Sequence, residues 1–186
     1  MQLVALLLAS IPAISALSIN LDARQTTAYE YHNIHPNGDK SKCISVLGGK
    51  IVIGAAIDIY DCNGSAGQKW SWSLPGLFTT NPTTGQNICM DLNITDWSQI
   101  KDGTGVVLKR CELPGSEDGI PTQAWGQPQA WNFNTIGQSI SSNTSGNMCL
   151  DLTGGSKANQ NPLQIWRCSD DKTKPWKNQI WTLTKV

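Results

Sequence analysis

The chain has 186 residues, and its fourteen basic and fourteen acidic side chains cancel to a formal net charge of zero. Binding to nucleic acid or to an anionic membrane surface rests on an excess of basic charge. We therefore expect neither nucleic acid as a partner nor membrane insertion. The two histidines, and six cysteines without a Cys-x-x-Cys pair, also predict no metal site and no cofactor.

The first segment of the chain, residues 1–16, is apolar and uncharged. Its apolar run Leu3–Ala9 is much shorter than the roughly 20 residues of a membrane-spanning helix, and the small residues at its end suit signal peptidase. We expect a signal peptide over 1–16, a short processed or disordered leader over 17–28, and one domain over 29–186. The protein is then expected to be secreted and extracellular.

Beyond the leader the chain is an internal triplicate, with units over about 31–74, 75–134 and 135–186. In each unit a cysteine opens an apolar run, a second cysteine follows about twenty residues later, and a Gln-x-Trp closes the unit. The units contain Cys43, Cys62 and Gln68-Lys69-Trp70; Cys89, Cys111 and Gln129-Ala130-Trp131; and Cys149, Cys168 and Gln179-Ile180-Trp181. Such self-similarity predicts that copies of one unit stack around a shared core.

The cysteines predict three disulfides, because the chain is expected to be secreted. Six cysteines allow 15 pairings, but each repeat carries its own pair at matching positions. We predict Cys43–Cys62, Cys89–Cys111 and Cys149–Cys168. Three Asn-x-Ser/Thr sequences, at Asn63, Asn93 and Asn143, are predicted N-glycosylation sites and place three loops at the surface.

Short β-branched or aromatic segments bounded by Gly, Pro, Asn and Asp predict strands. They are Ile51–Ile53, Ala56–Tyr60, Val106–Leu108 and Leu163–Trp166. No stretch after residue 28 keeps a helical apolar period, so the predicted fold is all-β. About four short strands per unit, twelve in all, would close around a pseudo-threefold axis and remove exposed edges. His32 and His35 are expected in an N-terminal loop.

The repeats differ in length. The first cysteines of successive repeats are 46 and then 60 residues apart, and the extra residues lie between Cys111 and Trp131. They include Leu113–Pro121, a turn-rich, acidic segment that we expect to be a surface loop. They also include a second Gln-x-Trp, Gln123–Trp125. We assign the core position to Gln129–Trp131, because Asn132-Phe133 follows it as similar pairs follow the other two copies.

Cys-x-Asp-Leu, then Gln-x-Trp-x-Cys, then Asn-Gln-x-Trp is the pattern of the third repeat. With three cysteine pairs in register, the chain resembles the ricin B-chain-like (R-type) lectins, the QxW-repeat family, over residues 31–186. The resemblance implies a β-trefoil of three pseudo-repeats with intra-repeat disulfides. It also implies binding to glycans of the galactose or N-acetylgalactosamine (GalNAc) type, carried on a glycoprotein or a polysaccharide.

A monosaccharide presents hydroxyls that need paired donors and acceptors, and an apolar C–H patch that favours an aromatic face. In the third repeat Asp151 can accept from two hydroxyls, Trp166 can stack on the ring, and Gln164 and Asn178 add donors and acceptors. All four stand at the positions that contact sugar in the family. The third repeat is therefore the predicted main site.

The first repeat has lost part of this set. Ser45 stands at the carboxylate position and Gly67 at the amide position, although Asp58 and Tyr60 remain. Asp58 and Tyr60 are therefore only weaker sugar-binding candidates.

The second repeat keeps the carboxylate of Asp91 but has Lys109 at the aromatic position and Pro128 at the amide position. Asp91 is therefore also a weaker candidate. Another aromatic residue, such as Trp97 or Trp125, could replace the lost stacking face.

The remaining motif residues have structural interpretations. Trp70, Trp131 and Trp181 are expected to fill the shared core, and Gln68, Gln129 and Gln179 to satisfy nearby backbone groups. Asp91 and Asp151 can instead bond only turn backbone, Asp91 more readily than Asp151. Trp176, just before Asn178, is either a rim of the site or a loop anchor.

Nothing in the sequence supplies catalytic machinery. There is no Gly-x-Ser-x-Gly and no His-Glu-x-x-His. Asp151 has no obvious second carboxyl close in sequence, although Asp170 and Asp171 could approach it. We expect a non-catalytic, secreted carbohydrate-binding protein. The alternative is a trefoil that acts through protein contacts, as a protease inhibitor or effector, through a loop such as Leu113–Pro121 and with vestigial sugar sites. Neither the exact sugar nor the oligomeric state follows from the sequence.

Overall fold

The protein was analysed as a computed structural model, which describes residues 29–73, 76–111, 129–142 and 147–186. The signal peptide and leader expected over 1–28 lie outside these residues. So do Leu113–Pro121, Trp125, Pro128 and Asn143. No helix in the described part of the chain is long and apolar enough to cross a membrane.

The described residues form twelve strands, four in each repeat, as the sequence predicts. The first repeat holds β1 (His32–Pro36), β2 (Lys42–Val46), β3 (Ile57–Asp61) and β4 (Ser71–Ser73). The second holds β5 (Gly76–Thr80), β6 (Asn87–Leu92), β7 (Val106–Arg110) and β8 (Trp131–Asn134). The third holds β9 (Ser139–Ser142), β10 (Met148–Leu152), β11 (Asn161–Arg167) and β12 (Trp181–Lys185).

Helical structure is limited to single 3₁₀ turns. These are η1 (Leu47–Gly49), η2 (Ala66–Gln68), η3 (Trp97–Gln99), η4 (Thr153–Gly155) and η5 (Lys177–Gln179). Each lies in a loop between strands, so none interrupts the sheets. The frequent glycines and prolines explain this, because both residues are poor in helix interiors.

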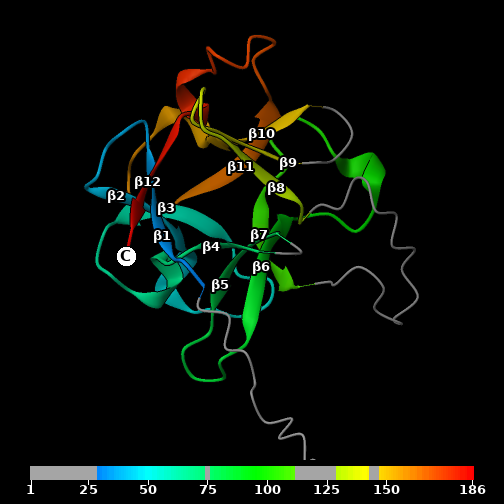
Figure 1. Ribbon diagram of the computed structural model, residues 1–186. Coiled ribbons are helices and arrows are strands. Elements are labelled where there is room, and N and C mark those ends of the chain that lie inside the picture. The colour runs from blue at the N-terminus through cyan, green and yellow to red at the C-terminus, as the bar shows by residue number, and fades with distance from the viewer. Residues whose placement is uncertain (1–28, 74–75, 112–128, 143–146) are drawn as a thin grey trace, which may run out of the picture.

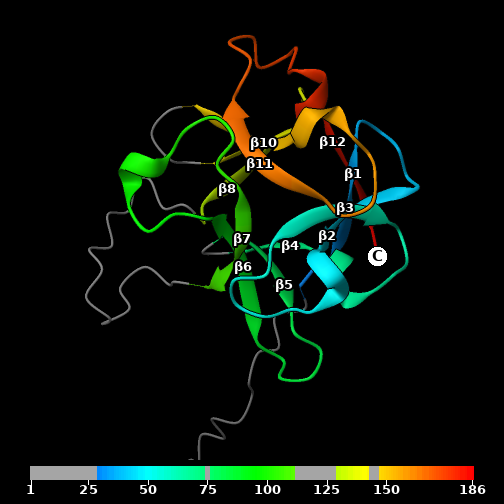
Figure 2. The ribbon, with the colours of Figure 1, turned by 180° about the vertical axis from the view of Figure 1, so that it is seen from behind.

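The three repeats are arranged as a trefoil. Figures 1 and 2 show the hairpins β2–β3, β6–β7 and β10–β11 pointing in three directions around a common centre. Backbone bonds join neighbouring hairpins: Leu108 donates to Ala55, Ile165 donates to Thr104, and Asn161 of β11 pairs with Ile59 of β3. The ring closes because β1 pairs with β12. These links give the pseudo-threefold closure that the sequence predicts.

Equivalent positions of the repeats supply the core. The Gln-x-Trp tryptophans Trp70, Trp131 and Trp181 are 0, 4 and 0% exposed, and each ring nitrogen donates to a backbone carbonyl of its own repeat: those of Ile44, Met90 and Leu150. Burying an indole with its N–H satisfied combines a large apolar area with no lost hydrogen bond. The tryptophans therefore fix each hairpin over the centre of the trefoil.

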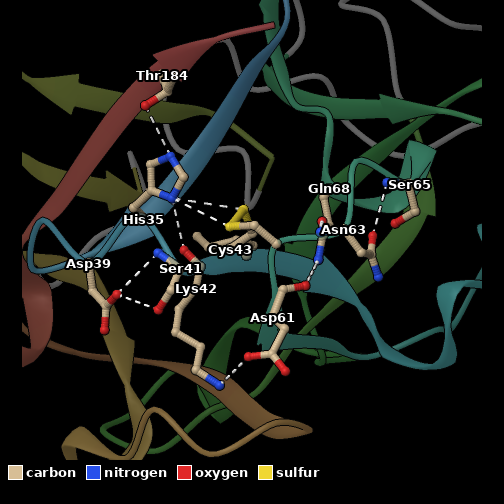
Figure 3. The surroundings of a disulfide bond; sticks show 12 residues. His35, Asp39, Ser41, Lys42, Cys43, Asp61, Asn63, Ser65, Gln68 and Thr184 are labelled. Carbon is tan, nitrogen blue, oxygen red and sulfur yellow. Dashed lines mark hydrogen bonds and ion pairs between the residues drawn. A yellow bond between two sulfur atoms is a disulfide. The ribbon is translucent and has the colours of Figure 1, made fainter.

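All three predicted disulfides are present: Cys43–Cys62, Cys89–Cys111 and Cys149–Cys168. Each joins the first strand of a hairpin to the residue just after its second strand, and the Gln-x-Trp glutamine lies close by. In the first repeat Gln68 donates to the Asp61 carbonyl and accepts from the Asn63 amide (Figure 3). The glutamine thus holds the chain as it leaves the hairpin.

Two local expectations are wrong. Ile51–Ile53 are not a strand, because the chain turns there: Gly54 has φ of +85° and donates to the Leu108 carbonyl of the next repeat. Only Ile51 reaches the core, and Val52 and Ile53 are exposed. His32 and His35 do not lie in a loop but on β1, whose partner β12 is about 150 residues away in the sequence.

Candidate functional site

Strand register brings three of the predicted site residues together. Asp151 on β10 lies opposite Gln164 on β11, and Trp166 lies opposite Cys149. Leu150 and Ile165 between them are fully buried in the core. Since side chains alternate along a strand, Asp151, Gln164 and Trp166 share the outer face of the hairpin.

The Asp151 carboxylate is a buried acceptor that is already oriented. It is 5% exposed, and Gln164 donates to its Oδ1 over 3.1 Å. Burial raises the pKa of Asp151, while hydrogen bonds from Gln164 and Gln179 oppose that rise and the nearby charge of Asp102 adds to it. Gln179 thus has a second role beside the structural one predicted for it. The hydrogen bonds leave further lone pairs on the carboxylate for other donors.

Trp166 supplies the apolar face. Its side chain is 43% exposed although β11 runs through the middle of the six-stranded sheet. A loop of the second repeat braces this strand, because Gly103 donates to the Ile165 carbonyl and Asp102 accepts from the Arg167 amide over 2.7 Å. The backbone on both sides of Trp166 is therefore fixed by hydrogen bonds, and a large part of its aromatic side chain is accessible to a ligand.

Asn178 approaches the site from η5, where it directly precedes Gln179. It lies against η4, and a Cβ on Gly155 would be 2.8 Å from the Asn178 Oδ1. Gly155 also has φ of +67°, which disfavours other residues. The glycine thus leaves room for the Asn178 amide. All four predicted residues of the third repeat fall within one hairpin and the turn packed against it.

The second repeat has its carboxylate occupied. Gln129 donates to Asp91 Oδ2 over 2.9 Å, the Leu92 amide donates to Oδ1, and the ammonium of Lys109 lies 3.8 Å from Oδ1. Lys109 holds the place that Trp166 has in the third repeat, and Val107 holds the place of Gln164. The position that Trp166 holds near Asp151 is therefore taken here by a cation that lies against the carboxylate.

In the first repeat Asp58 takes the place of Gln164, opposite Ser45. It is 1% exposed, neither carboxyl oxygen has a partner among the described residues, and burial raises its pKa to about 7. Tyr60 is half-buried. Gly67, at the amide position, packs against Val46. A ligand has little access to Asp58, and Ser45 holds the position of the Asp151 carboxylate, so the first repeat lacks the carboxylate and amide pair of the third.

Other candidate residues lie at the surface. Asn63 and Asn93, two of the predicted glycosylation sites, are exposed. Trp97 is 52% exposed on η3 and Trp176 is 59% exposed just before η5. Trp176 is therefore accessible for a rim role beside Asn178.

Sequence reasoning missed Asp102, which comes from another repeat and which no spacing rule connects with Asp151. Among the described residues one group, His35 with Cys43 and Cys62, has side chains of metal-binding type close together. Those two cysteines form the first disulfide, so their sulfurs are not thiolate ligands.

The third repeat of this β-trefoil thus places the buried Asp151 carboxylate and the exposed Trp166 ring on one face of a hairpin. A family model described as the ricin-type beta-trefoil lectin domain matches residues 30–176. The chain belongs to this family of carbohydrate-binding domains. No curated protein matches the chain by sequence.

Solved structures share the fold. A designed threefold-symmetric protein, ThreeFoil, has a TM-score of 0.60 and 19% identity, over 84% of this chain and 99% of its own. The earthworm R-type lectin C-half in complex with GalNAc has a TM-score of 0.56 and 13% identity, over 84% and 99%. The Macrolepiota procera ricin B-like lectin in complex with lactose has a TM-score of 0.55 and 18% identity, over 87% and 99%.

Proposed function

We propose that this protein is a secreted, non-catalytic lectin that binds galactose- or GalNAc-type glycans mainly through its third repeat. The observation that carries the proposal is the outer face of β10–β11, where the oriented, buried Asp151 carboxylate lies beside the exposed ring of Trp166. Two of the similar structures are lectins in complex with GalNAc and lactose, which supports this ligand class.

The chemistry of the site suits a small sugar. Asp151 accepts from two neighbouring hydroxyls, Gln164 and Asn178 supply amide donors and acceptors, and the C–H face of the ring stacks on Trp166. A hydrogen bond to a charged group contributes about 1.5 to 3 kcal/mol. One shallow site of this kind then gives a dissociation constant of roughly micromolar to millimolar, which corresponds to about 4 to 8 kcal/mol.

The test is a glycan array probed with the secreted protein and with Asp151→Asn, followed by calorimetry with methyl β-galactoside. Asp151→Asn keeps the shape of the side chain and removes its charge, so binding to terminal galactosides should be lost. Asp91→Asn, at the equivalent position of the second repeat, is the matched control and should keep wild-type binding. If neither the wild type nor the control binds any glycan while folded, the lectin proposal fails and the protein-contact alternative gains.

Secretion is proposed from the apolar segment 1–16 and from the exposure of Asn63 and Asn93, which suits glycan attachment. Expression in a secreting eukaryotic host, with mass analysis before and after enzymatic deglycosylation, tests both points. A cell-retained product without added glycan would contradict them.

A further inference from the structure

A pocket of about 360 Å³ lies beside the third disulfide, on the side of β10 away from β11. None of Asp151, Gln164, Trp166 and Asn178 lines it. It is bounded by the hairpin β8–β9, by the Cys149–Cys168 disulfide and by the loop Ser169–Pro175. Its volume falls at the lower end of the roughly 300 to 1,000 Å³ typical of small-molecule sites.

The pocket exists because one side chain is small where the other repeats have a large one. Ser141 lies between Asn132 of β8 and Cys149 of β10. In the second repeat Phe78 takes this place, opposite Cys89, and is 2% exposed beneath Tyr29.

In the first repeat His35 takes the same place. Figure 3 shows its ring against the Cys43–Cys62 disulfide, bonded to the Lys42 carbonyl and to the Thr184 hydroxyl. Two of three equivalent positions are thus filled by a ring, and the third is left open by Ser141.

The outer wall of the pocket is held in place. Asn134 donates from Nδ2 to the Lys172 carbonyl over 3.1 Å, and its Oδ1 accepts from the Ile136 amide. A Cβ on Gly137 would be 2.1 Å from the same Lys172 oxygen, so only glycine allows the loop to come this close. The loop Ser169–Pro175 is therefore docked on the β8–β9 hairpin, and the pocket is already formed without a ligand.

The lining is rich in neutral hydrogen-bonding groups. Lys172 is the single charged lining residue among those described, and the side-chain hydroxyls and amides come from Ser139, Ser141, Ser169, Asn132, Asn134 and Asn147. Neutral donors and acceptors in a preformed pocket suit a neutral ligand with many hydroxyls.

Gln179 also lines the pocket, and its amide carries an unpaired acceptor. It is fully buried, and its Oε1 has no partner among the described residues. The equivalent oxygen of Gln68 accepts from the Asn63 amide over 2.8 Å. An unpaired buried carbonyl is costly, so a hydroxyl that reached it would bind favourably.

Two features connect the pocket with the Asp151 site. Gln179 lines the pocket, and its amide also opposes the rise in the pKa of Asp151. Ser141, Cys149 and Trp166 also lie in one row across β9, β10 and β11. Ser141 and Trp166 are therefore two strand spacings apart, about 10 Å, which is within the span of a short oligosaccharide.

We propose that this pocket is a second sugar subsite, which holds a further neutral residue of an oligosaccharide whose terminal galactose-type residue is bound by Asp151 and Trp166. The inference rests on the proposed function of the third repeat. It extends that function from a single sugar to a chain of sugars.

The experiment compares two ligands by calorimetry: methyl β-galactoside, and a linear tetrasaccharide with a terminal galactose. Ser141→Phe installs the side chain that the second repeat carries at this position and fills the pocket. We expect the wild type to bind the tetrasaccharide at least about tenfold more tightly than the monosaccharide, a gain of about 1.4 kcal/mol. Ser141→Phe should lose this gain and keep the monosaccharide affinity within about twofold, or 0.4 kcal/mol.

Asn132→Ala tests the same subsite at an exposed position, where the risk of misfolding is small. It should lower tetrasaccharide affinity only. In NMR spectra, the amide signals of Asn147 and Ser169 should shift with the tetrasaccharide and stay in place with the monosaccharide.

The results separate the two proposals. If tetrasaccharide and monosaccharide bind equally to the wild type, or if Ser141→Phe and Asn132→Ala leave the tetrasaccharide affinity unchanged, the subsite is refuted while the Asp151 site stands. If Asp151→Asn leaves monosaccharide binding unchanged, the proposed function of the third repeat is refuted, and the subsite argument fails with it.

Discussion

Replacing Asp58 by asparagine should change how stability depends on pH. Asp58 is 1% exposed, without a partner among the described residues, and burial raises its pKa from an ordinary 3.8 to about 7. Between these values the native protein holds a proton that the unfolded chain has released. The native state then binds more protons, so the free energy of unfolding falls as pH rises through this window.

The magnitude follows from the shift. About three pKa units at 1.36 kcal/mol each give about 4 kcal/mol between pH 4 and pH 8, an upper bound because the protein relaxes around a buried charge. Asp58→Asn has no such titration. Its free energy of unfolding, relative to the wild type, should therefore rise steadily from pH 4 to pH 8.

The assay is urea unfolding followed by tryptophan fluorescence from pH 4.5 to pH 8, with the disulfides kept oxidised. Asp61→Asn is the control, because Asn159 and Lys42 lower the pKa of this exposed carboxyl. The stabilising effect of the Asp61 carboxylate is lost only as pH falls below the ordinary pKa range of an aspartate. The unfolding free energy of Asp61→Asn should therefore run parallel to that of the wild type above pH 5. Parallel curves for Asp58→Asn and the wild type from pH 5 to pH 8 would refute the reasoning.

The remaining predictions concern the third repeat and its disulfide. Trp166→Ala should weaken galactoside binding by up to roughly tenfold, since stacking contributes about 0.5 to 1.5 kcal/mol. Asp91→Ala should cost about 1 to 3 kcal/mol of unfolding free energy and leave the galactoside affinity measured by calorimetry unchanged. On acidification, galactoside affinity should begin to fall at a pH above the ordinary pKa of an aspartate, because the pKa of Asp151 is raised. Asp102→Asn removes a nearby negative charge and should move this loss of affinity to lower pH. An identical pH profile in that variant would contradict the charge coupling. Replacing Cys149 and Cys168 by serine should lower the unfolding free energy by about 3 kcal/mol and weaken binding. The same change at Cys43 and Cys62, which are also 19 residues apart, should cost similar stability and spare binding.

Most of the fold could be predicted because its determinants are local and repeated. Each repeat carries its own cysteine pair and its own tryptophan, so the pairing and the core follow once the triplication is seen. What failed depends on distant residues. His32 and His35 enter a strand because β12 supplies its partner, and Ile51–Ile53 turn because Gly54 bonds to the next repeat.

The candidate site also has a part that the sequence predicts and a part that depends on distant residues. Asp151, Gln164 and Trp166 could be predicted as one site because they match the sugar-contact positions of the family that the sequence resembles, and the strand register places them on one face. The occupied carboxylate of Asp91 and the burial of Asp58 could not be predicted, since both depend on packing around the strands.

The pocket at Ser141 was also invisible in the sequence. A serine in a strand is unremarkable until the rings of His35 and Phe78 are seen at the equivalent positions of the other repeats.

The pairing of β1 with β12 also constrains how the molecule can form. The chain is synthesised from its N-terminus, so β1 is made long before β12, the strand that pairs with it among the described residues. The four-stranded sheet β4–β7 can assemble earlier, but the trefoil closes only when Trp181–Lys185 have emerged. Until then the row from His32 to Pro36 is an open edge, and a second nascent chain can pair with it. The emergence of β12 therefore determines whether β1 pairs within its own molecule or with a neighbouring chain.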